Sequence, residues 1–300
     1  MTDAQAFSDD PPRTGRLHLL INPEAGRGRA GQVAQQVEDT LRTAGWHLSV
    51  TRTLSPAHAE QLALDAGPGD VVAMLSGDGL MPRVAAGVRR SGALLAPLPG
   101  GRANDLAALL GIPKDPRVAA SRLHLAPERR LDLGFANGRP FFGIAGAGFT
   151  PLANERANAL RWLSGPPVYA FSGVLTFAGF RPITFRVQID GVVQQFRGWD
   201  VLVGNSGRFG GGMQMCPGAD LSDGLLDVLS IGPAPHWQFP RILASIYSGT
   251  HLRFPYLTLT RGQEVVLDAD RPVAVYGDGD LIATLPCTIT VQPRAVRVLG

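Results

Sequence analysis

The stretch from Val71 to Gly79 constrains the fold of this chain more than any other. It opens with a short apolar run, Val71–Leu75, of the length expected for a strand buried in a parallel sheet. The run stops at Ser76-Gly77-Asp78-Gly79, where the glycines allow backbone N–H groups to approach a bulky ligand closely. Apolar residues at helical spacing follow, so a helix N-terminus points at this turn and predicts a phosphate-binding site. Asp78 is expected to meet a metal ion or a ligand hydroxyl, because a bare carboxylate repels phosphate.

Strand-like and helix-like segments alternate up to about residue 110, which predicts a parallel sheet covered on both faces. The other expected strands are Leu17–Ile21, His47–Arg52 and Ala93–Leu98. Glycine-rich loops begin after three of the four strands, at Asn22, Ser76 and Pro99. Loops after parallel strands emerge at one edge of the sheet, where such sheets bind ligands. The three loops therefore predict a nucleotide site.

After about residue 130 the pattern changes to short strand-like segments between Gly, Pro and Asp turns, which indicates an antiparallel β domain. Two helical stretches interrupt it, near residues 152–180 and at His236–His251. The second has an apolar stripe that we interpret as core packing, although a lipid-facing stripe has the same appearance. The expected strands are Arg130–Ala136, Ile183–Ile189, Trp199–Gly204, Leu226–Ile231, Tyr256–Thr260, Glu264–Asp268, Pro272–Tyr276, Leu281–Leu285 and Thr288–Val291.

The amino-acid composition excludes some mechanisms and limits the expected partners and location of the protein. Lys114 is the only lysine in the chain. No other position can therefore supply a P-loop lysine or the lysine amine of a Schiff base. The net charge of +3 is too small to argue for nucleic acid, but it is compatible with an anionic substrate or membrane surface. Two isolated cysteines imply no disulfide framework, so a cytoplasmic location is expected. Residues 1–14 read as a disordered tail, and Val168–Phe180 is too short to be a transmembrane segment.

Several motifs allow both a chemical and a structural interpretation. Arg102 suits a phosphate, because its planar fork binds phosphate oxygens in pairs, whereas Asp105 is also a candidate helix N-cap. Asp223-Gly224 is compatible with either a hairpin or a metal site. Asp278 and Asp280 in a glycine turn predict either a base with an orienting or metal-binding carboxylate, or an ordinary hairpin.

Together these residues resemble the diacylglycerol kinase catalytic family, which includes sphingosine and ceramide kinases and bacterial lipid kinases. Five blocks stand in the family's order and cover about residues 15–300. They are Asn22-Pro23-Glu24-Ala25-Gly26, like N-P-x-[SA]-G; Ser76-Gly77-Asp78-Gly79-Leu80-Met81, like S-G-D-G-L-M; Leu98–Ala107, like L-P-x-G-T-x-N-D-F-A; Gly204 through Gly210-Gly211-Gly212-Met213 to Asp227, like the second-domain signature; and Gly277-Asp278-Gly279-Asp280, like the D-G-E motif.

The resemblance implies a parallel α/β ATP-binding domain, residues 15–129, then an antiparallel β-sandwich substrate domain, residues 130–290. A segment at 291–300 is expected to return to the first domain. ATP and Mg²⁺ are implied, with Asp280 and Asp278 as catalytic residues. Magnesium is implied at Asp220, Asp223 and Leu225, the first and last through backbone carbonyls. The implied nucleotide-binding residues are Asn22, Pro23, Gly26, Thr53, Ser76, Gly77, Asp78, Gly79, Leu80, Met81, Pro82, Gly101, Arg102, Asn104 and Asp105.

The chain departs from the family pattern at four places. Relatives have Asn or His followed by Glu where this chain has Pro82-Arg83, and Thr where it has Arg102. They have Asp where this chain has Thr150, and Glu where it has Asp280. Arg83 and Arg102 are candidates for the positive charge that other phosphoryl-transfer sites take from lysine. The leading hypothesis is an ATP-dependent lipid kinase that binds the membrane peripherally. A kinase of a soluble alcohol or nucleotide, and a non-catalytic nucleotide- or lipid-binding protein, are the alternatives. A homodimer is compatible with the sequence, which does not fix the oligomeric state.

Overall fold

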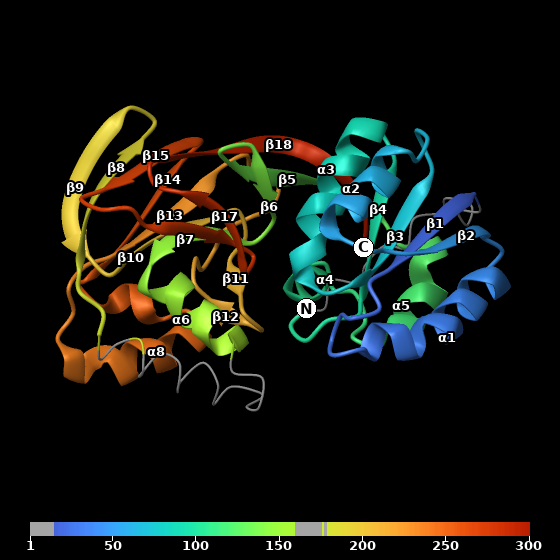
Figure 1. The fold of residues 1–300 in the computed structure, drawn as a ribbon, viewed down its shortest axis with the longest axis horizontal. Coiled ribbons are helices and arrows are strands. Elements are labelled where there is room, and N and C mark those ends of the chain that lie inside the picture. The colour runs from blue at the N-terminus through green and yellow to red at the C-terminus, as the bar shows by residue number, and fades with distance from the viewer. Residues whose placement is uncertain (1–14, 160–175, 177–178) are drawn as a thin grey trace, which may run out of the picture. The chain divides into compact units, whose positions relative to one another are not determined.

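The computed structural model describes residues 15–159, 176 and 179–300. The expected disordered tail, and much of the helical stretch expected near 152–180, lie outside these residues. The chain divides into two compact units (Figure 1). The first contains the chain up to Arg130 together with Val296–Gly300, and the second contains Leu131–Ala295.

The first unit is built on a parallel sheet in the order β2-β1-β3-β4. Both β3 and β4 are buried along their whole length, as the continuous apolar run of β3 predicts. The strands are β1 (Arg16–Ile21), β2 (His47–Arg52), β3 (Val71–Ser76) and β4 (Leu94–Pro99). The helices are α1 (Arg29–Thr43), α2 (Pro56–Leu64), α3 (Met81–Ser91), α4 (Asp105–Leu109) and α5 (Pro116–Arg122), with 3-10 turns η1 (Asp78–Leu80) and η2 (Leu123–Leu125).

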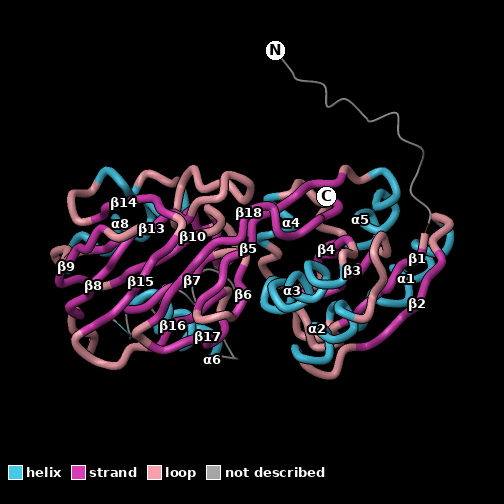
Figure 2. The backbone as a smooth tube through the Cα atoms, turned by 90° about the horizontal axis from the view of Figure 1, so that it is seen from above, coloured by secondary structure: helices cyan, strands magenta, loops and turns pink. Residues whose placement is uncertain are grey.

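Helices cover both faces of this parallel sheet. Figure 2 shows α2 and α3 on one side and α5 on the other. Val37 and Leu41 of α1 and Ala120 of α5 pack with Leu19 of β1 in one buried cluster. The helices α2 and α3 approach closely at Gly87, where a Cβ atom would lie 2.6 Å from the carbonyl oxygen of Glu60. Burial on both faces is what the alternation of strand and helix predicts.

The second unit contains an antiparallel sheet in the order β14-β13-β10-β7-β16-β17 and a layer formed by β18-β15-β8-β9 with β5 and β6. The strands are β5 (Glu128–Ala136), β6 (Arg139–Phe141), β7 (Ile144–Gly148), β8 (Ile183–Ile189), β9 (Val192–Gly198), β10 (Asp200–Gly204), β13 (Leu226–Ile231), β14 (Leu257–Gly262), β15 (Glu264–Ala269), β16 (Ala274–Gly277), β17 (Asp280–Thr284) and β18 (Cys287–Leu299), with the short hairpin β11 (Arg208–Phe209) and β12 (Met213–Gln214). Its helices are α6 (Phe149–Ala159) and α8 (Phe239–Tyr247), with 3-10 turns η3 (His236–Gln238) and η4 (His251–Arg253).

A hydrophobic core separates the two layers of the second unit. Phe185 and Val265 from one layer pack with Val203 and Val228 from the other. On the outer face of the six-stranded sheet, Ile242 and its helix α8 add a smaller cluster. The chain is therefore a parallel α/β unit followed by an antiparallel β sandwich, and the predicted fold class is confirmed.

The last strand, β18, contributes to both units. Its first residues pair with β15 in antiparallel register, from Cys287 to Thr290. Near its end, Val298 pairs with Leu95 of β4 in parallel register. Val298 and Leu299 are buried, so the first unit includes a strand from the far end of the chain.

Candidate functional site

The loops that follow β1, β3 and β4 pack against one another through glycines. A Cβ atom on Gly26 would lie 2.5 Å from the carbonyl oxygen of Gly100. One on Gly101 would lie 2.4 Å from the Cα atom of Gly77. Side chains at these positions would push the loops apart, so glycine is required for their contact. The structure thus brings together the three loops whose convergence the sequence predicts.

Asn22 joins the first loop to the end of β3. Its backbone N–H donates to the carbonyl of Leu75 at 3.1 Å, and its Nδ2 donates to Ser76 Oγ at 3.3 Å. Its Oδ1 accepts a hydrogen bond from the N–H of Glu24 at 3.2 Å. On the other side of β3, the N–H of Gly100 donates to the carbonyl of Ser76 at 2.8 Å. Ser76 is therefore held by both neighbouring loops.

Asp78 caps a helix that belongs to a different loop. Its Oδ1 accepts a hydrogen bond from the N–H of Leu106, in the first turn of α4, at 3.2 Å. Asn104 stands at the N-cap position with φ 54°, and its side chain exchanges hydrogen bonds with the backbone of Gly101. The alternative in which Asp105 is the N-cap is therefore wrong, because Asp105 is the first residue of the helix itself. A small pocket is lined by Ser76, Gly77, Asp78, Met81, Asn104 and Leu106.

The remaining predicted nucleotide residues surround these loops. Thr53 is buried at the end of β2, where its hydroxyl donates to the carbonyl of Ile21 at 3.2 Å. Pro23 lies in the first loop, directly after β1. Gly79 and Leu80 form η1, and Met81 and Pro82 begin α3. Arg102 is exposed in the third loop.

Asp278 and Asp280 lie in the hairpin between β16 and β17. Gly277 pairs with Asp280, and the two residues between them have φ angles of 50° and 94°. Positive values at both positions are those of a two-residue hairpin turn, a geometry that is compatible with a chemical role for the two carboxylates. The Asp278 carboxylate accepts hydrogen bonds from the N–H groups of Phe142, Gly143 and Ile144 at 2.7, 2.8 and 3.2 Å. It anchors the hairpin to the start of β7 and the two residues before it, whereas Asp280 begins β17 and is exposed.

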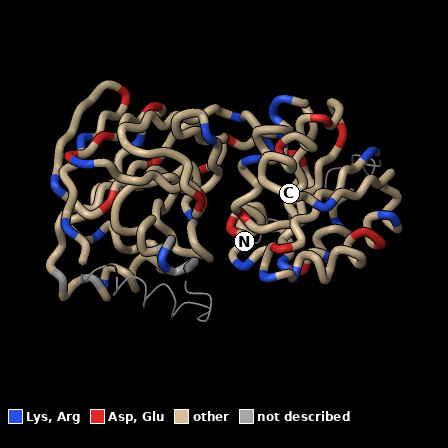
Figure 3. Tube along the Cα trace, in the orientation of Figure 1, with Lys and Arg blue, Asp and Glu red and all other residues tan. Residues whose placement is uncertain are grey.

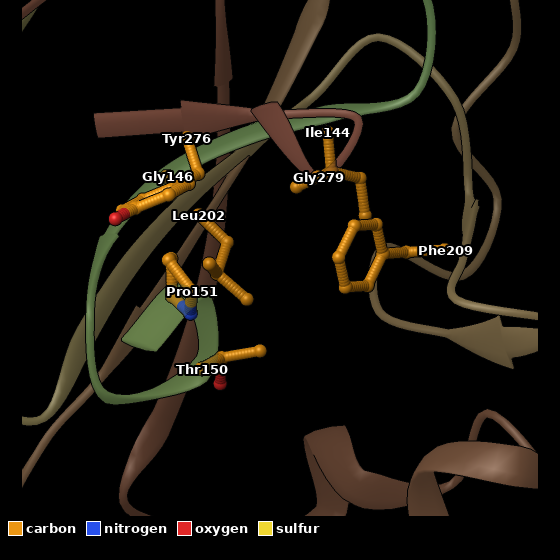
Figure 4. A pocket seen from close by; sticks show the side chains of 8 residues that line it. All are labelled: Ile144, Gly146, Thr150, Pro151, Leu202, Phe209, Tyr276 and Gly279. Atoms are coloured by element: carbon orange, nitrogen blue, oxygen red, sulfur yellow. The ribbon is translucent and has the colours of Figure 1, made fainter. Parts of the chain in front are cut away.

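A pocket with apolar walls lies beside this hairpin (Figure 4). Its lining includes Gly279 of the turn, Tyr276 of β16 and the phenyl ring of Phe209. Figure 4 shows Ile144, Leu202 and Phe209 facing a common space. The walls are apolar but the enclosed space is small, and nothing in the sequence placed these residues together.

The candidate metal residues lie in the loop before β13. Asp220 Oδ1 accepts hydrogen bonds from the N–H and the hydroxyl of Ser222 at 2.9 and 2.7 Å. Asp223 Oδ1 accepts one from the N–H of Leu225 at 3.0 Å. Within the described part of the chain, no three His, Cys, Asp or Glu side chains are grouped so that they could hold a metal ion. Any cation here needs backbone carbonyls among its ligands.

Sequence reasoning missed a third carboxylate in this region, Asp132 of β5. Its two oxygens accept hydrogen bonds from the N–H groups of Gly224 and Arg294 at 2.7 and 2.6 Å. Burial raises the pKa of Asp132, and the negative charges of Asp223 and Asp220 raise it further. The only sequence signal is an acidic residue between Leu131 and Leu133, in the apolar second half of the strand.

Comparison with known families assigns both units. The diacylglycerol kinase catalytic domain matches residues 16–136, and the YegS C-terminal NAD kinase beta sandwich-like domain matches residues 143–300, which is more than half of the chain. The chain belongs to the diacylglycerol kinase family. As a member of this family it is a kinase. Among the helices that the structure describes, none has the length and hydrophobicity needed to cross a membrane.

Relatives in the diacylglycerol kinase family match along nearly the whole chain. A diacylglycerol kinase of Mycobacterium tuberculosis is 31% identical over 95% of both chains. A probable YegS-like lipid kinase of Pseudomonas putida is 34% identical, over 85% of this chain and 88% of the relative. A crystal structure from Bacillus anthracis has the same fold, with a TM-score of 0.80 and 21% identity over 95% of this chain and 94% of that one.

The structure accounts for two departures from the diacylglycerol kinase motifs. Arg83 Nη1 lies 3.0 Å from Glu60 Oε2, so its charge is already paired and Arg102 remains as the candidate phosphate ligand. Thr150 stands where the family has Asp, and its Oγ1 donates to Asp200 Oδ2 at 2.8 Å. A buried carboxyl group is therefore present at this place in the fold, supplied by β10.

Proposed function

We propose that this chain is an ATP- and Mg²⁺-dependent lipid kinase that phosphorylates a primary hydroxyl of a diacylglycerol-like or sphingoid lipid. The observation that carries the proposal is the glycine-mediated packing of the three loops at the carboxyl ends of β1, β3 and β4 in a chain of the diacylglycerol kinase family. Backbone N–H groups and the N-termini of helices gather at this edge, and both favour bound phosphate. ATP is assigned to these loops.

The nucleotide side of the reaction depends on positioning. Asn22 joins the first loop to Ser76 at the end of β3, and Asp78, which follows β3, joins the second loop to the third at Leu106. The backbone that faces the phosphates is therefore ordered before ATP binds. The guanidinium of Arg102 contributes positive charge to the phosphates. Most of the catalytic effect in phosphoryl transfer comes from such positioning and from charge stabilisation.

The acceptor side depends on the acidic hairpin. Asp280 is exposed and accepts the proton of the lipid hydroxyl as the γ-phosphoryl group is transferred. Asp278 holds the turn in place through its three backbone hydrogen bonds.

The backbone carbonyls of Asp220 and Leu225 and the carboxylate of Asp223 would hold Mg²⁺, which prefers oxygen ligands. Two carboxylates beside buried Asp132 create an excess of negative charge that a cation relieves. When bound to the nucleotide phosphates, Mg²⁺ neutralises charge that develops during transfer.

The test is transfer of labelled phosphate from ATP to a total lipid extract presented in vesicles, followed by identification of the labelled species. We expect a labelled lipid with the native chain and none with Asp280→Asn, whose nucleotide affinity should be unchanged. Asp39→Asn, which changes an exposed carboxylate on α1, is the matched control and should retain activity.

Two outcomes contradict the proposal. Label in water-soluble alcohols or nucleotides alone would show a kinase with a soluble acceptor. Binding of ATP without transfer to any hydroxyl would show a nucleotide-binding protein without turnover.

A further inference from the structure

The segment formed by η3, α8 and η4 in the second unit presents aromatic side chains to solvent. On its inner side, Ile242 and Ile246 are buried against the six-stranded sheet, as the core-packing interpretation of this stripe predicts. On its outer side, Trp237 is 66% exposed and Tyr247 is 43% exposed. Core packing therefore uses one side of the helix and leaves two large aromatic residues outside it.

Trp237 differs from the other tryptophans in the described residues. Trp46 and Trp199 are 5% and 6% exposed, whereas the indole of Trp237 contributes nothing to a core. The guanidinium carbon of Arg241 lies 5.7 Å from the centre of the Trp237 ring, one helical turn away. An indole and a tyrosine beside a cation combine apolar surface with polar tips, which is the chemistry found where proteins meet membrane interfaces.

The segment contains basic residues but no acidic ones. From Val228 to Gln263 the chain contains three arginines and neither Asp nor Glu (Figure 3, where arginines are blue and acidic residues red). Arg261 is paired with buried Asp227 at 2.9 Å. Arg241 and Arg253 are exposed, and in the described part of the chain neither forms an ion pair. Two positive charges without an ion-pair partner therefore lie in the same segment as the exposed aromatic residues and favour an anionic surface.

We propose that the outer side of this segment, consisting of Trp237, Arg241, Tyr247 and Arg253, docks the kinase on an anionic lipid bilayer. The aromatic rings enter the headgroup region and the arginines bind lipid phosphates. The surface extends the proposed function by assigning the contact through which a lipid kinase reaches its substrate. Docking itself needs neither ATP nor catalysis.

The experiment measures sedimentation of the full chain with vesicles of phosphatidylcholine alone or mixed with phosphatidylglycerol. We expect binding to the mixed vesicles that weakens as salt is raised. Trp237→Ala should lower the partition coefficient about tenfold. Arg241→Gln should lower it about fivefold, and only on the anionic vesicles. Arg197→Gln, an exposed arginine of β9, is the matched control and should bind like the native chain.

A second measurement guards against loss of folding. Lipids brominated on their acyl chains should quench the tryptophan fluorescence of the native chain, and Trp237→Ala should remove this quenching while its circular dichroism stays unchanged. Equal vesicle binding by the native chain, Trp237→Ala and Arg241→Gln would overturn the proposal. A native chain that ignores vesicles but forms dimers that Trp237→Ala dissociates would also overturn it, because the surface would then bind a second copy.

Kinase activity is measured separately, on acceptor lipid dispersed in detergent. Binding to vesicles without phosphate transfer leaves the docking surface in place and removes the kinase assignment. Phosphate transfer in detergent without binding to vesicles keeps the kinase assignment and removes the docking surface.

Discussion

The buried carboxyl group of Asp200 should make the stability of the fold depend on pH. The residue is fully buried at the start of β10, where the N–H and the hydroxyl of Thr150 each donate to it at 2.8 Å. Burial raises the pKa of Asp200 from 3.8 to about 7, and the hydrogen bonds from Thr150 and Phe149 offset only part of this effect. The folded chain therefore keeps this proton through a pH range in which the unfolded chain has released it.

The sign follows from the raised pKa. The contribution of this group to folding is fully present below about pH 4 and is lost as the pH rises to about 7. At about 1.4 kcal/mol for each pKa unit, the loss reaches about 4 kcal/mol when Asp200 is ionised. Asp200→Asn stays neutral at every pH, and its amide can accept from the Thr150 N–H and donate to the Thr150 hydroxyl.

We expect Asp200→Asn to be more stable than the native chain by up to about 4 kcal/mol at pH 8, and by only about 2 kcal/mol at pH 5. Urea unfolding at pH 5, 6, 7 and 8 measures this difference. Asp39→Asn, at an exposed site, should show no such pH-dependent gain. If Asp200→Asn and the native chain differ equally at pH 5 and pH 8, the carboxyl group is ionised throughout and the reasoning is refuted.

Three other predictions concern the site. Asp278→Ala leaves three backbone N–H groups without their acceptor and should cost about 3 to 5 kcal/mol in urea unfolding. Asp280→Ala, at an exposed position, should cost clearly less stability while it abolishes lipid phosphorylation. Gly101→Ala should weaken binding of a fluorescent ATP analogue at least about tenfold, because its Cβ atom collides with the neighbouring loop, whereas Gly15→Ala has open space and should have no effect. Asp223→Asn should raise the Mg²⁺ concentration for half-maximal phosphate transfer about tenfold, and an unchanged titration would remove this residue from the metal site.

The sequence predicted the elements whose patterns are local. The apolar run of β3 and the apolar spacing of the helix after it are visible without the fold, and so is the order of the three glycine loops. β7 escaped prediction, because Ile144–Gly148 consists mostly of small residues with no alternation. Its glycines are there for packing, since a Cβ atom on Gly146 would lie 2.4 Å from the side chain of Leu202 on β10.

Contacts between distant residues limited prediction of the site. The hydrogen bond from Leu106 to Asp78 joins two loops, so Asp78 could be noticed in the sequence but not identified as a helix cap. Asp132 and Asp200 each lie inside strands, and their roles depend on partners from other elements. Asp278 was recognised as part of a turn, yet its three backbone donors lie more than 130 residues earlier in the chain.

The position of β18 has a consequence for how the molecule is made. The sheet of the first unit ends at β4, whose outer edge is paired near Leu95 by a residue synthesised some 200 positions later. Until Val296–Gly300 leave the ribosome, at about 5 to 20 residues per second, the nascent chain holds an open sheet edge for tens of seconds. A fragment cut at residue 136, where the catalytic-domain match ends, would keep that edge permanently and is expected to aggregate.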